Sequence, residues 1–82
     1  MQKKLSELRP GEKGTVLWLT GTGAIRRRLT DIGLIAGTEV VCLRNSPLGD
    51  PTAYRIRGAV MALRKGDASR VYLETGRRTP WA

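Results

Sequence analysis

The side chains best suited to chemistry in this sequence are cations. Fifteen Lys and Arg residues stand against seven Asp and Glu, which gives a net charge of +8 over 82 residues. Three of the cations are consecutive, Arg26, Arg27 and Arg28. Guanidinium groups bind carboxylates and phosphates, so the triplet is a candidate site for an anionic partner, with a solvated helix face as the alternative.

The remaining basic charge is less concentrated. Lys3, Lys4, Arg77 and Arg78 lie near chain ends that we expect to fray, and without them 11 basic residues face 7 acidic ones. Arg26, Arg27 and Arg28 then supply three of the four excess positive charges. The basic signal is therefore local to one segment.

The types of residue that the sequence contains argue against an enzyme. The chain contains no His, which removes the usual proton shuttle at neutral pH and the commonest transition-metal ligand. The carboxylates are scattered singly, and the one Cys, Cys42, lies in an apolar stretch where we expect it to pack as a small hydrophobe. The sequence predicts no catalytic residues, no metal site and no cofactor. A weak homo-oligomer, and a metal site shared between its chains, stay open.

The triplet must be positioned by a helix that begins near Gly23. Apolar residues at i, i+4 and i+7 share one face of it: Ile25, Leu29 and Ile32. Thr22 can cap its amino end. Arg28 flanks the apolar face, whereas Arg26 and Arg27 point away, and Arg27 is spaced to pair with Asp31.

The helix is expected to end at Gly33. A glycine there can adopt the left-handed conformation that closes a helix, and Leu34 would fold back against Leu29. Ile35 to Thr38 then form a tight turn in which Gly37 supplies a positive φ. Helix, cap and turn are thus specified within one stretch.

Five short strands are predicted around this helix, at residues 15–19, 38–43, 54–57, 59–63 and 71–74. Leu5 and Leu8 suit a single helical turn before a type II turn at residues 9–12, and Asp67 is placed to cap a short turn over residues 68–70. One domain over residues 1–75 follows, with a loose tail at 76–82. Five strands with one helix between the first two indicate a small, partly open barrel.

The loop between the second and third strands is rich in turn residues. It contains Pro47, Leu48, Gly49, Asp50 and Pro51. Each Pro restricts its own φ and its predecessor, so the loop has little freedom to lose on binding. A recognition surface and a simple hairpin connection are both open.

Two segments together resemble the ferrous iron transport protein A (FeoA) family. They are R-L-T-D-I-G-L-I-A-G-T-E-V at residues 28–40 and P-L-G-D-P at 47–51, and L-S-E-L-R-P-G-E and A-L-R-K-G-D-A are similar too. The resemblance spans about residues 5–74. It implies an SH3-like β-barrel and a small accessory of FeoB, the membrane permease for Fe(II) that carries a cytosolic GTPase domain. Iron-dependent repressors share the fold, but they add a helix-turn-helix and metal ligands that this sequence lacks.

The expected function is therefore a protein-binding module on a FeoB-type permease. No apolar run approaches the roughly 18 residues of a membrane span, and the amino terminus lacks the apolar region of a signal peptide. We expect a cytoplasmic protein, peripheral at the inner face of the membrane only through its partner. The candidate contact surface comprises the Arg triplet, Leu34, Ile35 and residues 47–51, with a core role as the alternative for both Leu34 and Ile35.

A small nucleic-acid-binding barrel is the alternative function. The charge, the triplet, and Tyr54 or Tyr72 as stacking platforms favour it. However, single-strand binders interleave several aromatic residues with basic ones, and this chain has two Trp, two Tyr and no Phe. That composition disfavours nucleic acid.

Overall fold

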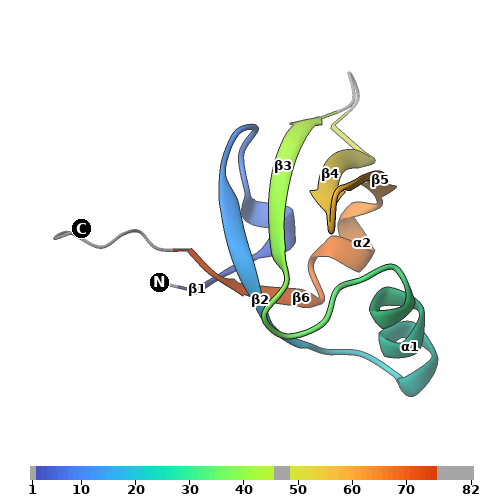
Figure 1. Ribbon diagram of the computed structural model, residues 1–82. Helices are drawn as coiled ribbons and strands as arrows, with labels where there is room; N and C mark the ends of the chain where they lie inside the picture. Colours follow the sequence, from blue (N-terminus) through green and yellow to red (C-terminus); the bar gives the residue numbers. More distant parts are fainter. Residues whose placement is uncertain (1, 46–48, 76–82) are drawn as a thin grey trace, which may run out of the picture.

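The computed structural model describes residues 2–45 and 49–75 and has one antiparallel sheet with the strand order β1-β6-β2-β3-β4-β5 (Figure 1). The elements are β1 (Gln2–Lys4), η1 (Leu5–Glu7), β2 (Lys13–Leu19), α1 (Gly23–Asp31), β3 (Glu39–Asn45), β4 (Thr52–Ile56), β5 (Ala59–Leu63), α2 (Lys65–Ala68) and β6 (Val71–Glu74). The mainly-β fold is confirmed, with all five predicted strands and the main helix between the first two of them.

The expectation of a frayed amino terminus is wrong. Strand β1 pairs with β6, with Gln2 opposite Glu74 and Lys4 opposite Tyr72. The Lys4 backbone N–H also donates to Glu7 Oε1 at 2.8 Å. Two lysines in three residues carry no local strand signal, and the partner strand is at the other end of the domain. Only the assembled sheet defines β1.

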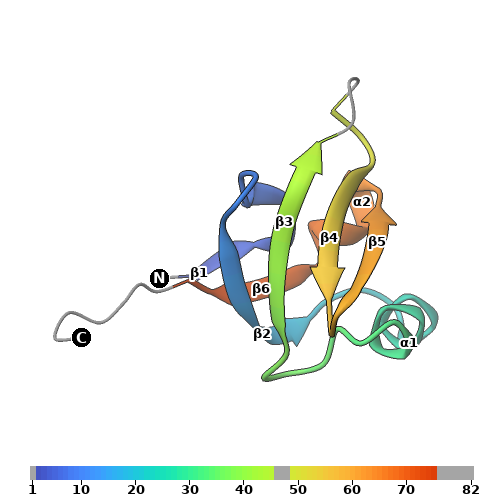
Figure 2. The same cartoon turned by 45° about the horizontal axis from the view of Figure 1, so that its top comes forward.

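The core is enclosed by the curved sheet (Figure 2). Register shifts between Val16 and Trp18 in β2 and between Cys42 and Arg44 in β3 interrupt the ladders, and such bulges increase strand bending. The largest fully buried side chains are Tyr54, Leu5, Leu29, Leu34, Ile56, Leu73, Val16, Val40, Val71 and Cys42. Cys42 is thus a core residue, as predicted, and Leu5 and Leu8 pack inward from a single helical turn.

Two turns set the course of the strands. The Glu12 N–H donates to Arg9 O at 2.9 Å across the predicted turn, where Gly11 has a φ of +91°. Between β4 and β5, Arg57 and Gly58 have φ values of 53° and 85°. Positive φ at both central residues is typical of the type I′ turn that closes a two-residue hairpin.

The prediction that Asp67 caps a short turn is wrong. Helix α2 begins at Lys65, so Asp67 lies within it. The Lys65 N–H at the start of α2 donates to Asp50 Oδ1 at 2.8 Å. A carboxylate from the β3–β4 loop thus satisfies an amide of the first turn of α2, and this partner is distant in the sequence.

Some predicted features lie outside the described residues. They are the tail at 76–82 and, within the loop, Pro47 and Leu48. Among the helices that the structure describes, none has the length and apolar character needed to span a bilayer.

Candidate functional site

The ends of α1 are fixed by hydrogen bonds within its own segment. The Thr22 hydroxyl accepts from the Ile25 N–H at 3.3 Å. At the other end, Leu34 N–H donates to Leu29 O at 3.1 Å and Gly33 N–H to Thr30 O at 2.9 Å, the two bonds of a Schellman motif. Gly33 has a φ of +107°, as predicted. The structure places Leu34 in the core, fully buried, rather than on the surface.

The turn after the helix displays Ile35. The Thr38 N–H donates to Ile35 O at 3.0 Å and Gly37, with a φ of +93°, donates its N–H to Val16 O at 2.8 Å. The second bond ties the turn to β2. Ile35 is 42% exposed, so the turn presents a large aliphatic side chain at the surface.

A groove lies between this turn, the end of α1 and the β4–β5 hairpin. Its volume is about 330 Å³, and its lining includes Ile32, Ile35, Ile56, Ala59 and Met61. Gly33 lies so close to the hairpin that a Cβ there would come within 2.6 Å of Arg57 Cδ. The absence of a side chain at this glycine therefore allows the helix end and the hairpin to approach.

The Arg triplet is divided by its contacts. Arg28 Nη2 lies 2.7 Å from Asp67 Oδ1 of α2. The expected Arg27 to Asp31 pair is not formed, and neither Arg26 nor Arg27 has an ion-pair partner within the described part of the chain. The helix spacing allowed the local pair, but the partner that the fold supplies comes from a distant element. Arg26 and Arg27 remain exposed cations.

The β3–β4 loop does not join this surface. It leads into β4 at Thr52, whereas Ile56, at the far end of the same strand, lines the groove. Figure 1 shows α1 and residues 49–51, which lead into β4, at opposite ends of the sheet. Asp50 is exposed but is engaged with α2, and Pro51 is half-buried. The structure therefore brings Ile35 together with the helix of the triplet and separates both from residues 49–51.

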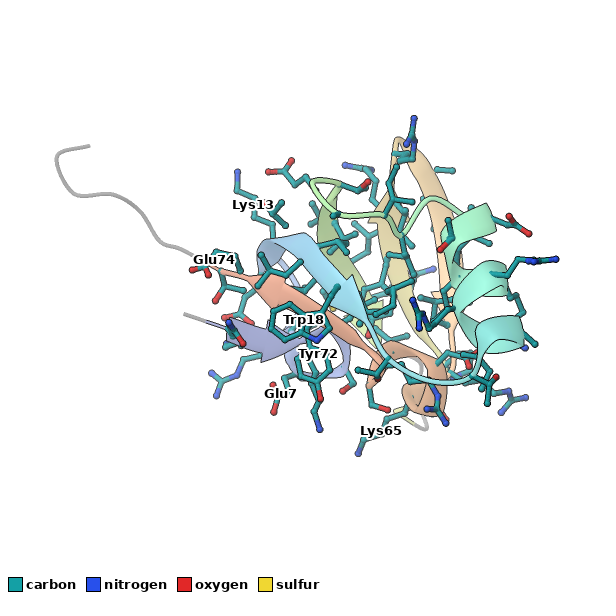
Figure 3. All side chains as sticks on the ribbon, turned by 90° about the horizontal axis from the view of Figure 1, so that it is seen from below. Glu7, Lys13, Trp18, Lys65, Tyr72 and Glu74 are labelled. Atoms are coloured by element: carbon teal, nitrogen blue, oxygen red, sulfur yellow. The ribbon has the colours of Figure 1, made fainter. Side chains whose placement is uncertain are left out.

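An aromatic pair was not predicted as a surface feature. Trp18 and Tyr72 stack with ring centroids 5.2 Å apart and an interplanar angle of 16°, and Trp18 is 45% exposed (Figure 3). Lys4 Nζ lies 5.9 Å from the Tyr72 centroid. Strand alternation puts Trp18 on the face of Val16, and the bulge between them turns it outward.

Tyr54 lies inside the molecule. Its hydroxyl donates to Leu5 O at 3.3 Å, and it is only 2% exposed. Burial, with a smaller contribution from Cys42, raises its pKa to about 12. Tyr54 is therefore not a stacking platform for bases.

Metal-binding side chains do not converge in the described ranges. No group of three or more Cys, Asp or Glu side chains there could hold a metal ion. Burial raises the pKa of the Cys42 thiol, which disfavours the thiolate that would bind a metal or attack a substrate. The described surface at this site thus presents exposed arginines on α1 and a groove whose lining mixes apolar side chains with Thr30, Asp31 and Arg57.

Fold and surface together define a small SH3-like barrel with an apolar and cationic face. The model of the FeoA domain matches residues 3–75, and the chain belongs to the FeoA family. The solution structure of a FeoA-like protein from Clostridium acetobutylicum is 30% identical, with a TM-score of 0.86 over 96% of this chain and 92% of that one. The zinc complex of FeoA from Stenotrophomonas maltophilia, described as an SH3 domain protein, is 30% identical, with a TM-score of 0.77 over 88% of this chain and 89% of that one.

One relative carries the domain in a much longer chain. An Fe(2+) transport protein A/Fe(2+) transporter FeoB fusion protein of Porphyromonas gingivalis is 32% identical over 71 residues. The match covers 87% of this chain but only 8% of that protein.

Proposed function

We propose that this domain is an accessory of ferrous iron uptake that docks on a FeoB-type permease. The observation that carries the proposal is the fusion of a related domain to FeoB in one relative. Fusion holds the two parts at a high effective concentration, so that even a weak contact between them would be occupied in that protein.

The face that we propose for docking combines Ile35, the groove beside it and the exposed cations of α1. Ile35 offers an apolar anchor on a turn held by two backbone bonds, and Arg26 and Arg27 offer charge to an acidic surface. The domain acts by binding and not by catalysis. It works in the cytoplasm and reaches the membrane through the permease.

We do not assign nucleic acid as a partner. Of the two candidate tyrosines, Tyr54 is buried and Tyr72 is stacked on Trp18 and half-buried. Within residues 2–45 and 49–75 only one ring pair is thus presented, whereas strand binding uses a series of platforms along a groove.

The test is ferrous iron uptake in cells that lack the gene for this chain. We expect uptake through the permease to fall, to be restored by the wild-type gene, and not to be restored by Ile35→Glu at equal protein level. Lys13→Ala, a change on β2 away from the docking face, is the matched control and should restore uptake. Normal uptake in the deletion strain would show that the proposal is wrong.

A further inference from the structure

The two edges of the sheet differ in how they are protected. Strand order makes β1 and β5 the edges. β1 has three residues, of which two are lysines, and such charges discourage further strands. β5 reads Ala-Val-Met-Ala-Leu, with no charge, proline or glycine. β5 is therefore an unprotected apolar edge.

The register shows which backbone groups of β5 face outward. Ile56 and Ala59 flank the two-residue turn and form a pair, and Tyr54 pairs with Met61 two residues further on. In a two-residue hairpin the flanking pair is hydrogen-bonded, and bonded pairs then alternate with non-bonded ones. Ala59 and Met61 thus bond to β4, so the N–H and C=O groups of Val60 and Ala62 point away from it.

These outward groups are unused in the described part of the chain. No backbone bond outside the paired strands involves Val60 or Ala62. The Val60 side chain is 62% exposed, more than Trp18 and Ile35, the other exposed large hydrophobic residues that the structure describes. Backbone and side chain at this edge are both open to a partner.

The surroundings indicate what kind of strand would fit. Beside the edge, the groove presents Ile35 and Met61, and its lining also includes Thr30 and Asp31 of α1. Exposed cations stand at both ends of β5, Arg57 in the preceding turn and Arg64 directly after it, and Arg55 lies opposite Val60 on β4. An incoming strand with apolar residues at its centre and carboxylates at its ends would complement this edge.

We propose that β5 accepts an extended, apolar and acidic segment of the permease as an additional strand. This mode of recognition takes affinity from main-chain hydrogen bonds and specificity from alternate side chains. The inference rests on the proposed function, because it names how the permease would be held. A second copy of this chain is disfavoured as the occupant, since each copy carries a net charge of +8 and the edge is flanked by arginines.

The test uses Ala62→Pro. The Ala62 N–H faces away from β4, and proline is tolerated on an edge where its missing N–H would face solvent. The variant should keep the fold, checked by thermal melting, and bind the full-length permease in lipid nanodiscs about tenfold more weakly than wild type. Ala62→Ser, which keeps the N–H, is the matched control and should bind as wild type does.

Amide hydrogen exchange of the whole chain gives a second readout. Adding the permease should slow exchange at Val60 and Ala62 about tenfold or more. If Ala62→Pro lowers the melting temperature, Val60→Lys replaces it, because a lysine on the edge opposes strand addition without removing a backbone donor.

The outcomes separate the two proposals. If the wild type binds but Ala62→Pro and Val60→Lys bind equally well, strand addition is overturned and docking on the permease stands. If the wild type does not bind, the docking proposal fails and the strand proposal fails with it. Protection of Val60 and Ala62 in the chain alone, together with a dimer in sedimentation, would overturn the permease strand in favour of a second copy.

Discussion

At the scale of single residues, two kinds of position stabilise the domain. One is a buried side chain whose polar atom is hydrogen-bonded, and the other is a glycine with a positive φ. Tyr54 fills the core and still donates its hydroxyl proton to Leu5 O. Gly33 closes α1 and lies against the hairpin that follows β4.

Tyr54 should make stability fall at high pH. Its pKa is raised from 10.0 to about 12 by burial and by Cys42, so the unfolded chain releases the phenol proton first. The stabilisation is complete below pH 10 and is lost as the pH rises from 10 to 12, a loss of about 2 to 3 kcal/mol. Urea unfolding of wild type and Tyr54→Phe across this range measures it.

The Tyr54→Phe variant serves as the control for the other groups that titrate in the same range. At pH 7 it should cost about 1 kcal/mol through the lost hydrogen bond. Its further loss between pH 10 and pH 12 should be smaller than that of the wild type. Identical pH profiles for the two proteins would contradict the assignment.

Gly33→Ala should destabilise more than Gly37→Ala. Both glycines have positive φ, which costs a side chain about 1 to 2 kcal/mol, but only at Gly33 would the new Cβ meet Arg57 and Ile56. A Cβ at Gly37 has nothing within 4 Å. Chemical denaturation measures the free energy of unfolding of both variants. Equal losses would mean that the β4–β5 hairpin moves away from the new Cβ without destabilising the domain.

Residue-level features could be predicted from the sequence where donor and acceptor are close in the chain. The Thr22 cap, the Gly33 closure and the return of Leu34 toward Leu29 lie within one short segment, so residue type and spacing determine them. The Arg28 to Asp67 pair and the Asp50 bond to Lys65 join segments brought together by folding. Helix spacing therefore predicted a pair between Arg27 and Asp31, whereas the ion pair in the structure joins Arg28 to Asp67.

At the scale of elements, α1 is held to the barrel mainly through one side chain. Leu29 is its buried residue, whereas Ile25 and Ile32 are partly buried against the core. The predicted apolar face of the helix therefore does face the core, but only Leu29 at its centre is fully buried. The docking face that we propose depends on this helix staying in place.

Leu29→Ala should destabilise the domain by roughly 2 to 4 kcal/mol, because it removes a fully buried aliphatic side chain at a helix contact. Denaturant unfolding measures the loss. Ile25→Ala is the comparison and should cost less, since that side chain is only partly buried. A similar cost for both would show that α1 is held along its whole apolar face.

Removing the exposed arginines of α1 should weaken binding without lowering stability. Arg26→Ala with Arg27→Ala should leave the free energy of unfolding unchanged or raise it slightly, because cations near a helix amino end oppose its dipole. The same double variant should weaken binding to the permease, most visibly at low salt. Arg44→Ala is the control, because it also removes the charge of an exposed arginine but lies on β3.

At the scale of the whole molecule, the sequence predicted the barrel because each of its five main strands is marked by its own residues and turns. It could not predict β1, whose strand identity comes only from pairing with β6. The Ile35 turn precedes β3 and the loop follows it, so the predicted strand at residues 38–43 already implied that the two lie at opposite ends of the sheet. The candidate surface is accordingly smaller than predicted, and it centres on α1, Ile35 and the groove.

The most direct test of the central claim is equilibrium binding of the full chain to the full-length FeoB-type permease of the same organism in lipid nanodiscs. We predict saturable binding that Ile35→Glu abolishes and that Lys13→Ala leaves unchanged. Absence of saturable binding by the wild type, with and without guanine nucleotide, would contradict the account.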